Sequence, residues 1–184
     1  MNFLPTPLSG LIEIEATPHK DARGSFFRAF CPEEFAAAGI DFVPAQTNIS
    51  TNVAAGTLRG VHFQKSGHAE AKLVRAVSGR AFDVAVDLRP GPDFGKWHAV
   101  ELSAVRMNAI FIPAGFGHGF MTLEPDTVLL YQMSPMFVPG FGAGLRWNDP
   151  ALAIDWPMPP AVMSDADRGL PCLADFPPGI DLLA

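Results

Sequence analysis

The chain has 184 residues, a formal charge of −6 at pH 7, and two cysteines, Cys31 and Cys172, without the paired spacing of a zinc site or a redox couple. This length suits one domain over residues 1–184 that folds without a disulfide or a structural metal, and the acidic charge argues against a nucleic-acid surface. Because no apolar run approaches the roughly 18 residues that cross a bilayer, and no basic cluster precedes an apolar stretch at the N-terminus, we expect a cytoplasmic protein that binds no membrane.

Short strands separated by turns are the pattern that runs through the chain. Its 17 glycines and 18 prolines lie between short runs rather than in one linker, which is typical of an all-β fold. In chain order we expect strands over residues 11–15, 46–51, 57–64, 72–77, 80–88, 97–103, 108–112, 119–123 and 127–134. In residues 80–88 large apolar side chains alternate with alanine and aspartate, the period of two expected for a strand with one buried face. So many short strands predict a sandwich, a barrel or a jelly roll.

One short helix and a proline-rich tail complete the expected elements. Residues 32–38 begin with proline, continue with two acidic residues and are followed by Gly39, which is typical of a helix with a left-handed residue at its C-terminal end. We expect this helix to be peripheral. The tail after Trp156 is rich in proline, and we expect it to be a loop that wraps the barrel.

A histidine motif places these strands in a more specific class. Residues 113–118 read Pro-Ala-Gly-Phe-Gly-His and match the Pro-x-Gly-x-x-His motif of the cupin jelly roll, in which a turn delivers a histidine to the barrel mouth. Metal-binding cupins also carry an earlier motif with two histidines one residue apart and a glutamate, because these ligands must converge on one ion. Here residues 61–64 read Val-His-Phe-Gln, so the second histidine is missing and we expect no metal.

Two alternatives stay open at this motif. A metal-dependent cupin oxygenase or isomerase would have to recruit its ligands from His62, His68, Glu70 and His118. His118 could also be a structural histidine that is hydrogen-bonded to the backbone.

An ordered series of segments carries a closer resemblance. Residues 57–64 read Thr-Leu-Arg-Gly-Val-His-Phe-Gln, residues 71–79 read Ala-Lys-Leu-Val-Arg-Ala-Val-Ser-Gly, and residues 83–89 read Asp-Val-Ala-Val-Asp-Leu-Arg. Together with residues 21–26, 46–50, 113–120, 130–131, 144–150 and 164–167, they closely resemble the dTDP-4-dehydrorhamnose 3,5-epimerase family. The resemblance implies a cupin-type jelly roll that acts on a nucleotide-linked 4-keto-6-deoxy sugar without a cofactor. It also implies a homodimer in which an exchanged N-terminal strand completes the neighbouring pocket.

The chemistry of such a reaction asks for specific groups. Epimerisation next to a ketone needs a base, a cation or donor for the enolate oxygen, and an acid on the opposite face of the ring. His62 suits the base because imidazole titrates near neutral pH, and the resemblance places the family's catalytic histidine there. The resemblance also implies that Asp167 orients His62 and that the charge of Lys72 stabilises the enolate. It assigns Tyr131, the only tyrosine of the chain, to the return of a proton from the other face.

The resemblance implies a set of substrate-binding residues as well. Arg59 and Arg23 correspond to residues that hold the pyrophosphate, a role that suits guanidinium because it donates two parallel hydrogen bonds. In the implied dimer Arg23, with Phe26 and Arg28, reaches the pocket of the neighbouring subunit. The other substrate contacts are assigned to Gln46, Asn48 and His118.

Strand parity adds a structural expectation. Arg59 and His62 stand three residues apart, so in a regular strand their side chains would point to opposite faces. Both enter one pocket only if the ladder is irregular between them, and Gly60 is the expected site of a bulge.

The chain departs from the family pattern at four positions. It has Arg28 and Gly142 where the family has glutamate, Phe137 where the family has tyrosine, and Ala166 where the family has a basic residue. These departures spare the catalytic set and affect the binding set, so dTDP or another nucleotide remains open. A non-catalytic module that binds a nucleotide sugar is the other alternative, although it would retain His62 without a chemical reason.

Overall fold

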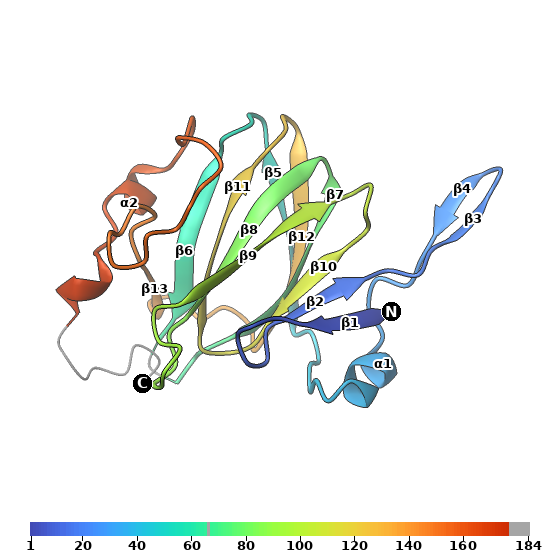
Figure 1. The fold of residues 1–184 in the computed structure, drawn as a ribbon, viewed down its shortest axis with the longest axis horizontal. Coiled ribbons are helices and arrows are strands. Elements are labelled where there is room, and N and C mark those ends of the chain that lie inside the picture. The colour runs from blue at the N-terminus through green and yellow to red at the C-terminus, as the bar shows by residue number, and fades with distance from the viewer. Residues whose placement is uncertain (66, 177–184) are drawn as a thin grey trace.

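Two antiparallel sheets that face each other form the body of the protein in the computed structural model, which describes residues 1–65 and 67–176 (Figure 1). The six-stranded sheet consists, in spatial order, of β1 (Asn2–Pro5), β2 (Ile12–Glu15), β10 (Ala109–Ile112), β7 (Ala71–Ser78), β12 (Thr127–Ser134) and β5 (Gln46–Asn52). The five-stranded sheet consists of β13 (Gly142–Gly144), β6 (Leu58–Gln64), β11 (Phe116–Thr122), β8 (Arg80–Asp87) and β9 (Trp97–Ser103). The chain crosses repeatedly from one sheet to the other, as in a cupin-type jelly roll. The predicted all-β fold is therefore confirmed.

The strands lie close to where their sequence patterns predict them. Those at residues 97–103 and 127–134 have the expected ends, and the other expected strands are present with ends shifted by one to three residues. The inner faces of the two sheets enclose an apolar core that includes Val74 and Leu129 from one sheet and Ala85 and Phe120 from the other. This core holds the two inner faces at a fixed separation, and the cavity described below opens between these faces.

Strand β8 is buried on both faces, so the expectation of one buried face was wrong. Val84 packs on the outer side of the sheet against Leu145 and Leu152 from the C-terminal part of the chain. The opposite face, with Ala85 and the fully buried Asp83, points into the barrel. The large apolar side chains therefore cover the outside of the sheet, and the alanine and aspartate face lines the interior.

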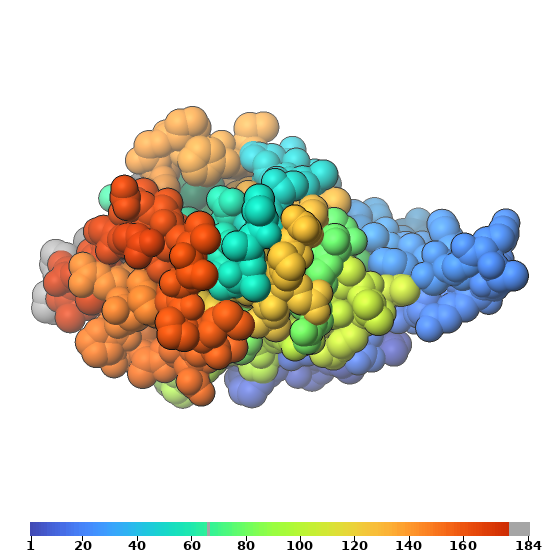
Figure 2. Space-filling view, turned by 90° about the horizontal axis from the view of Figure 1, so that it is seen from above, coloured from blue at the N-terminus to red at the C-terminus, as the bar shows by residue number. Residues whose placement is uncertain are grey.

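The N-terminal part of the chain contains the predicted helix. It also contains a hairpin that was not predicted. Helix α1 (Pro32–Ala37) nearly matches the expected 32–38, is followed by Gly39 at φ +78°, and packs Phe35 against the outer face of the six-stranded sheet. Strands β3 (His19–Asp21) and β4 (Gly24–Phe26) form a hairpin that projects from the body (Figure 1). Seen from above, this hairpin forms one end of the molecule and the C-terminal segment forms the other (Figure 2).

The C-terminal tail differs in part from the loop that was expected there. It runs along the outer side of β6 largely as loop, as expected, but it also contains helix α2 (Asp165–Arg168) and a 3-10 turn at Leu173–Asp175 (Figure 1). Ser164 caps α2, since its Oγ accepts a hydrogen bond of 3.0 Å from the backbone N–H of Asp167. Among the described residues no helix is long and apolar enough to span a membrane.

Candidate active site

Two joined cavities lie between the sheets. The larger, of about 530 Å³, extends toward Phe137 and Gly142 and is called the Phe137 lobe below. The second, of about 450 Å³, extends toward Arg59 and His118 and is called the Arg59 lobe. Both lobes are lined by His62, Lys72, Tyr131, Ala166 and Asp167. The four residues predicted to be catalytic therefore lie together where the two lobes meet.

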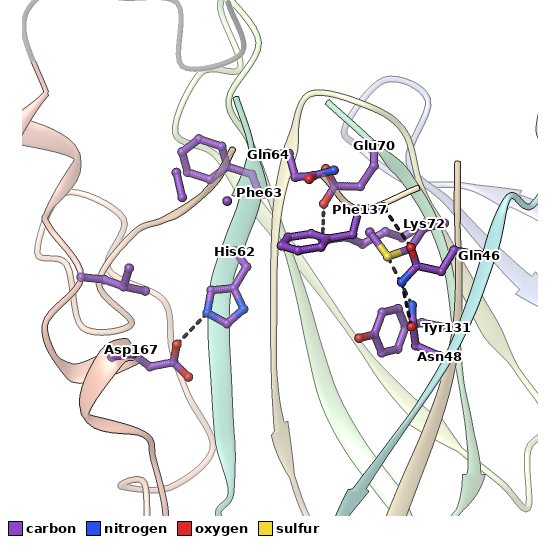
Figure 3. A pocket seen from close by; sticks show the side chains of 15 residues that line it. Gln46, Asn48, His62, Phe63, Gln64, Glu70, Lys72, Tyr131, Phe137 and Asp167 are labelled. Carbon is purple, nitrogen blue, oxygen red and sulfur yellow. Dashed lines mark hydrogen bonds and ion pairs between the residues drawn. The ribbon is translucent and has the colours of Figure 1, made fainter. Parts of the chain in front are cut away.

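His62 and Asp167 form a close pair on one side of this junction (Figure 3). β6 presents His62 and α2 presents Asp167, with 2.6 Å between Nε2 and Oδ1. The Asp167 side chain is 9% exposed, whereas that of His62 is 49% exposed. Because an ionised carboxylate only accepts hydrogen bonds, Nε2 of a neutral His62 carries the proton and Nδ1 is its basic atom.

The surroundings of His62 keep its imidazole neutral near pH 7. Although half of the His62 side chain is exposed in the open cavity, partial desolvation there lowers the pKa of His62 below its ordinary value of 6.5, and the neighbouring charges of Lys72 and His118 lower it further. The carboxylate of Asp167 acts in the opposite direction and offsets part of this shift. A neutral imidazole held by a buried carboxylate is the form of histidine that accepts a proton.

A bulge at Gly60 brings Arg59 and His62 to the same face of β6, as the sequence predicted. In the ladder with β11, His62 lies opposite His118 and Arg59 lies opposite Phe120, so the register shifts between them. Gly60 has φ +105°, and a Cβ there would stand 2.6 Å from the carbonyl oxygen of His118. Only glycine fits this position, and it turns both side chains toward the Arg59 lobe.

Lys72 and Tyr131 face His62 from the opposite sheet, on β7 and β12 (Figure 3). The Lys72 ammonium forms a buried ion pair with Glu70, at 3.1 Å from Oε1. Burial raises the pKa of Tyr131 above its ordinary value of 10, and the charge of Arg59 offsets part of the shift. Tyr131 therefore keeps its proton near neutral pH, on the side of the cavity opposite the basic histidine.

Gln46 and Asn48, two residues apart on β5, both point into the Phe137 lobe. The side-chain amide of Gln46 donates to Asn48 Oδ1 at 2.9 Å, and Gln46 Oε1 accepts from the backbone N–H of Phe137 at 3.0 Å. The second bond joins the edge strand β5 to Phe137, which also lines the lobe. Phe137, Gly142 and Ala166, three of the four departures from the family pattern, also line this lobe.

His118 is paired with a carboxylate, so the backbone hydrogen bond considered for it was wrong. Its Nε2 lies 2.9 Å from Oδ2 of Asp83, which is fully buried. Asp83 was not predicted as a partner of His118, because the alternation over residues 80–88 placed its aspartates on the face expected to be exposed. An aspartate on a strand that has no solvent-exposed face needs a polar partner, and this was the signal in the sequence that could have indicated Asp83. Within residues 1–65 and 67–176, no three His, Cys, Asp or Glu side chains gather as a potential metal site.

Three predicted binding residues lie outside this cavity in the same chain. Arg23 stands on the projecting hairpin, 90% exposed and paired with Asp21. Phe26, at the end of β4, is 75% exposed. Arg28 pairs with Glu34 of α1 at 2.6 Å. The structure thus separates these residues from the cavity that contains His62.

Comparison with known proteins gives a consistent family assignment. The family model described as dTDP-4-dehydrorhamnose 3,5-epimerase matches residues 5–175. A dTDP-4-dehydrorhamnose 3,5-epimerase from Sinorhizobium fredii is 43% identical over 159 residues, which is 85% of this chain and 82% of that protein. The enzyme of the same name from Methanothermobacter thermautotrophicus is 38% identical over 179 residues, with 95% and 96% coverage.

Solved structures extend the likeness to the fold. A dTDP-6-deoxy-D-glucose-3,5-epimerase from Legionella pneumophila, in complex with dTDP-4-keto-L-rhamnose, superposes with a TM-score of 0.90 at 34% identity, covering 94% of this chain and 93% of that one. A 3'-monoepimerase from Streptomyces bikiniensis, in complex with dTDP-quinovose, superposes with a TM-score of 0.85 at 35% identity, covering 92% and 87%.

Proposed function

The chain belongs to the dTDP-4-dehydrorhamnose 3,5-epimerase family, and we propose that it epimerises a dTDP-linked 4-keto-6-deoxy sugar at C3, at C5 or at both positions. One observation of the structure carries this proposal: the imidazole of His62 and the phenol of Tyr131 face each other across one cavity, which Lys72 also lines (Figure 3). Moving a proton at a carbon next to a ketone involves no net oxidation or reduction, so the reaction calls for no redox cofactor.

The first half of the proposed reaction is removal of the carbon-bound proton. Nδ1 of His62 takes this proton while Asp167 holds Nε2–H and stabilises the imidazolium that forms. Negative charge develops on the ketone oxygen, and the ammonium of Lys72 is the nearby cation that stabilises it.

The second half is return of a proton from the other face of the sugar ring. Tyr131 lies on the opposite sheet from His62, so a sugar held between them has a base on one face and an acid on the other. The raised pKa of Tyr131 keeps the hydroxyl protonated until the enolate forms. Reprotonation from that side inverts the configuration of the carbon.

Solvent-deuterium exchange tests this function directly. The purified protein is incubated in deuterated water with dTDP-4-keto-6-deoxyglucose and with its UDP-, CDP- and GDP-linked counterparts, and deuterium at C3 and C5 is followed by NMR. The proposal predicts exchange at one or both carbons with the dTDP-linked sugar. A protein that binds these compounds and exchanges no proton would instead be a binding module.

We also propose that the functional form is a homodimer in which the hairpin of one subunit completes the cavity of the other. The hairpin projects from the body and carries Arg23, which lies outside its own chain's cavity (Figure 1). Exposed apolar side chains on this hairpin and on the edge strand β5, such as Phe26 at 75% and Ile49 at 65%, are consistent with a surface that a second copy covers.

Mixed dimers test this arrangement. Arg23→Ala and His62→Ala each remove a residue from every site of a homodimer, whereas a purified mixed dimer would retain one site with both residues. We expect inactive homodimers and roughly half of wild-type activity in the mixed dimer. A fully active monomer, or a mixed dimer as inactive as its parents, would contradict the exchange of hairpins.

We infer that the chain folds as a single jelly-roll domain and that the protein is cytoplasmic. A cytoplasmic location is in keeping with the two cysteines, Cys31 and Cys172, which form no disulfide.

A further inference from the structure

Glu70 presents a buried oxygen without a partner at the edge of the active site. It immediately precedes β7 and is 6% exposed, and it lines the Phe137 lobe together with His62, Lys72 and Tyr131 (Figure 3). Oε1 lies 3.1 Å from the Lys72 ammonium. Oε2 is the one buried side-chain oxygen or nitrogen within the described part of the chain that has no hydrogen-bond partner.

The other polar side chains at this end of the lobe are already engaged. Asp167 is bound to His62, and Gln46 bonds to Asn48 and to a backbone N–H. Gln64 Oε1 accepts from the backbone N–H of Val138 at 2.7 Å, and its amide donates to the carbonyl oxygen of His68 at 3.2 Å. Gly142 contributes no side chain. Glu70 Oε2 is therefore the buried acceptor of this lobe that no group within the described residues satisfies.

An unpaired buried acceptor is costly, and native structures keep such groups mainly where they have a function. Oε2 is itself buried, so a ligand in the Phe137 lobe reaches it when the carboxylate turns about its last torsion, which has a broad profile. A ligand that donates a hydrogen bond in the Phe137 lobe would satisfy the free oxygen. A diphosphate would not, because it is anionic and has only acceptors.

We propose that Glu70 is a specificity-determining residue that accepts a hydrogen bond from a neutral donor of the bound nucleotide sugar, either a hydroxyl group or a base N–H. This inference rests on the proposed function. It assigns recognition of a neutral hydrogen-bond donor to the Phe137 lobe and disfavours the diphosphate directly beside Glu70.

A competing role predicts the opposite sign for binding. If Glu70 only neutralises Lys72, then removal of its charge leaves the ammonium free to attract the diphosphate, and nucleotide binding tightens. If Glu70 accepts a hydrogen bond from the ligand, its removal weakens binding. The direction of the change in Kd therefore separates the two roles.

The experiment measures Kd by titration calorimetry for dTDP, dTDP-glucose and inorganic pyrophosphate, with wild type, Glu70→Gln and Glu70→Met. Glu70→Gln keeps the shape and a carbonyl acceptor but loses the charge, and Glu70→Met loses the acceptor altogether. Glu101→Gln is the matched control, because it removes a partly exposed carboxylate that pairs with Arg80 away from the cavity.

We expect Kd for dTDP-glucose to rise about tenfold or more in Glu70→Met, and by less in Glu70→Gln, while pyrophosphate binds no more weakly. If Glu70→Met binds both dTDP and dTDP-glucose more weakly than wild type does, the hydrogen-bond donor lies on the nucleoside. If only dTDP-glucose binds more weakly, the donor lies on the hexose. Unchanged or tighter binding of dTDP-glucose in the Glu70→Gln variant overturns the inference, even if Glu70→Met fails to fold. If wild-type protein exchanges no sugar proton, the proposed function fails instead.

Discussion

Replacement of Asp167 by asparagine tests how the catalytic histidine is held. The substitution keeps the shape of the side chain but removes its charge from the 2.6 Å contact with His62. A hydrogen bond to a charged group contributes about 1.5–3 kcal/mol, and half-exposed His62 favours the lower part of that range because solvent screens the pair. At about 1.4 kcal/mol per factor of ten, we expect kcat/KM to fall by roughly ten- to fortyfold.

The pH dependence of the same variant gives a second readout. Burial lowers the pKa of His62 and Asp167 offsets part of that effect, so loss of the carboxylate lowers the pKa further. The base must be unprotonated to act, and the wild-type acid limb of kcat/KM therefore lies below pH 6.5. In Asp167→Asn this limb moves to still lower pH while the plateau falls.

Asp165→Asn is the matched control, since Asp165 lies on the same short helix with its side chain fully exposed and makes only a 3.9 Å contact with Arg168. Its rate and its pH profile should equal those of wild type. The reasoning is refuted if Asp167→Asn leaves kcat/KM within threefold of wild type, or if its acid limb moves to higher pH.

Three further predictions concern other parts of the site. Tyr131→Phe should block formation of the epimer while deuterium still washes into recovered substrate, and equal loss of both signals would point to a positioning role for Tyr131. Gly60→Ala should lower the free energy of unfolding by about 2–3 kcal/mol in denaturant titrations, because its Cβ meets the His118 carbonyl oxygen at 2.6 Å; unchanged stability would contradict the bulge. Arg28→Glu combined with Gly142→Glu should tighten dTDP binding about a hundredfold in calorimetry, because it restores two carboxylate acceptors, without raising the exchange rate at saturation. The side chain fits at Gly142, where a Cβ would meet only Phe137, at 3.7 Å. Weaker binding in the double variant would show that these departures are neutral.

Local sequence patterns were sufficient to predict those features of the fold that a single physical requirement determines. The strands at residues 97–103 and 127–134 follow from apolar and β-branched runs between turns, and their ends are as expected. The bulge at Gly60 follows from parity, because two side chains three residues apart must share one cavity. The strands depend only on neighbours along the chain, whereas the bulge also depends on the resemblance, which places both side chains in one cavity.

Tertiary context decided the features that the sequence did not reveal. The outer face of β8 is buried because Leu145 and Leu152, some sixty residues later in the chain, pack on it, so alternation alone could not show which face lines the barrel. Helix α2 has only four residues and depends on the Ser164 cap and on packing beside β6. The hairpin at residues 19–26 is exposed and has no apolar periodicity to mark it.

The central claim is that His62 removes the sugar proton, and deuterium wash-in with His62→Asn tests it most directly. Wild type and variant are compared at saturating dTDP-4-keto-6-deoxyglucose in deuterated water, with dTDP binding measured in parallel to show that the cavity is intact. The account predicts that exchange at C3 and C5 falls by at least about a hundredfold in the variant, while its dTDP affinity stays close to that of wild type. Exchange within tenfold of wild type in a folded, dTDP-binding His62→Asn protein would contradict it.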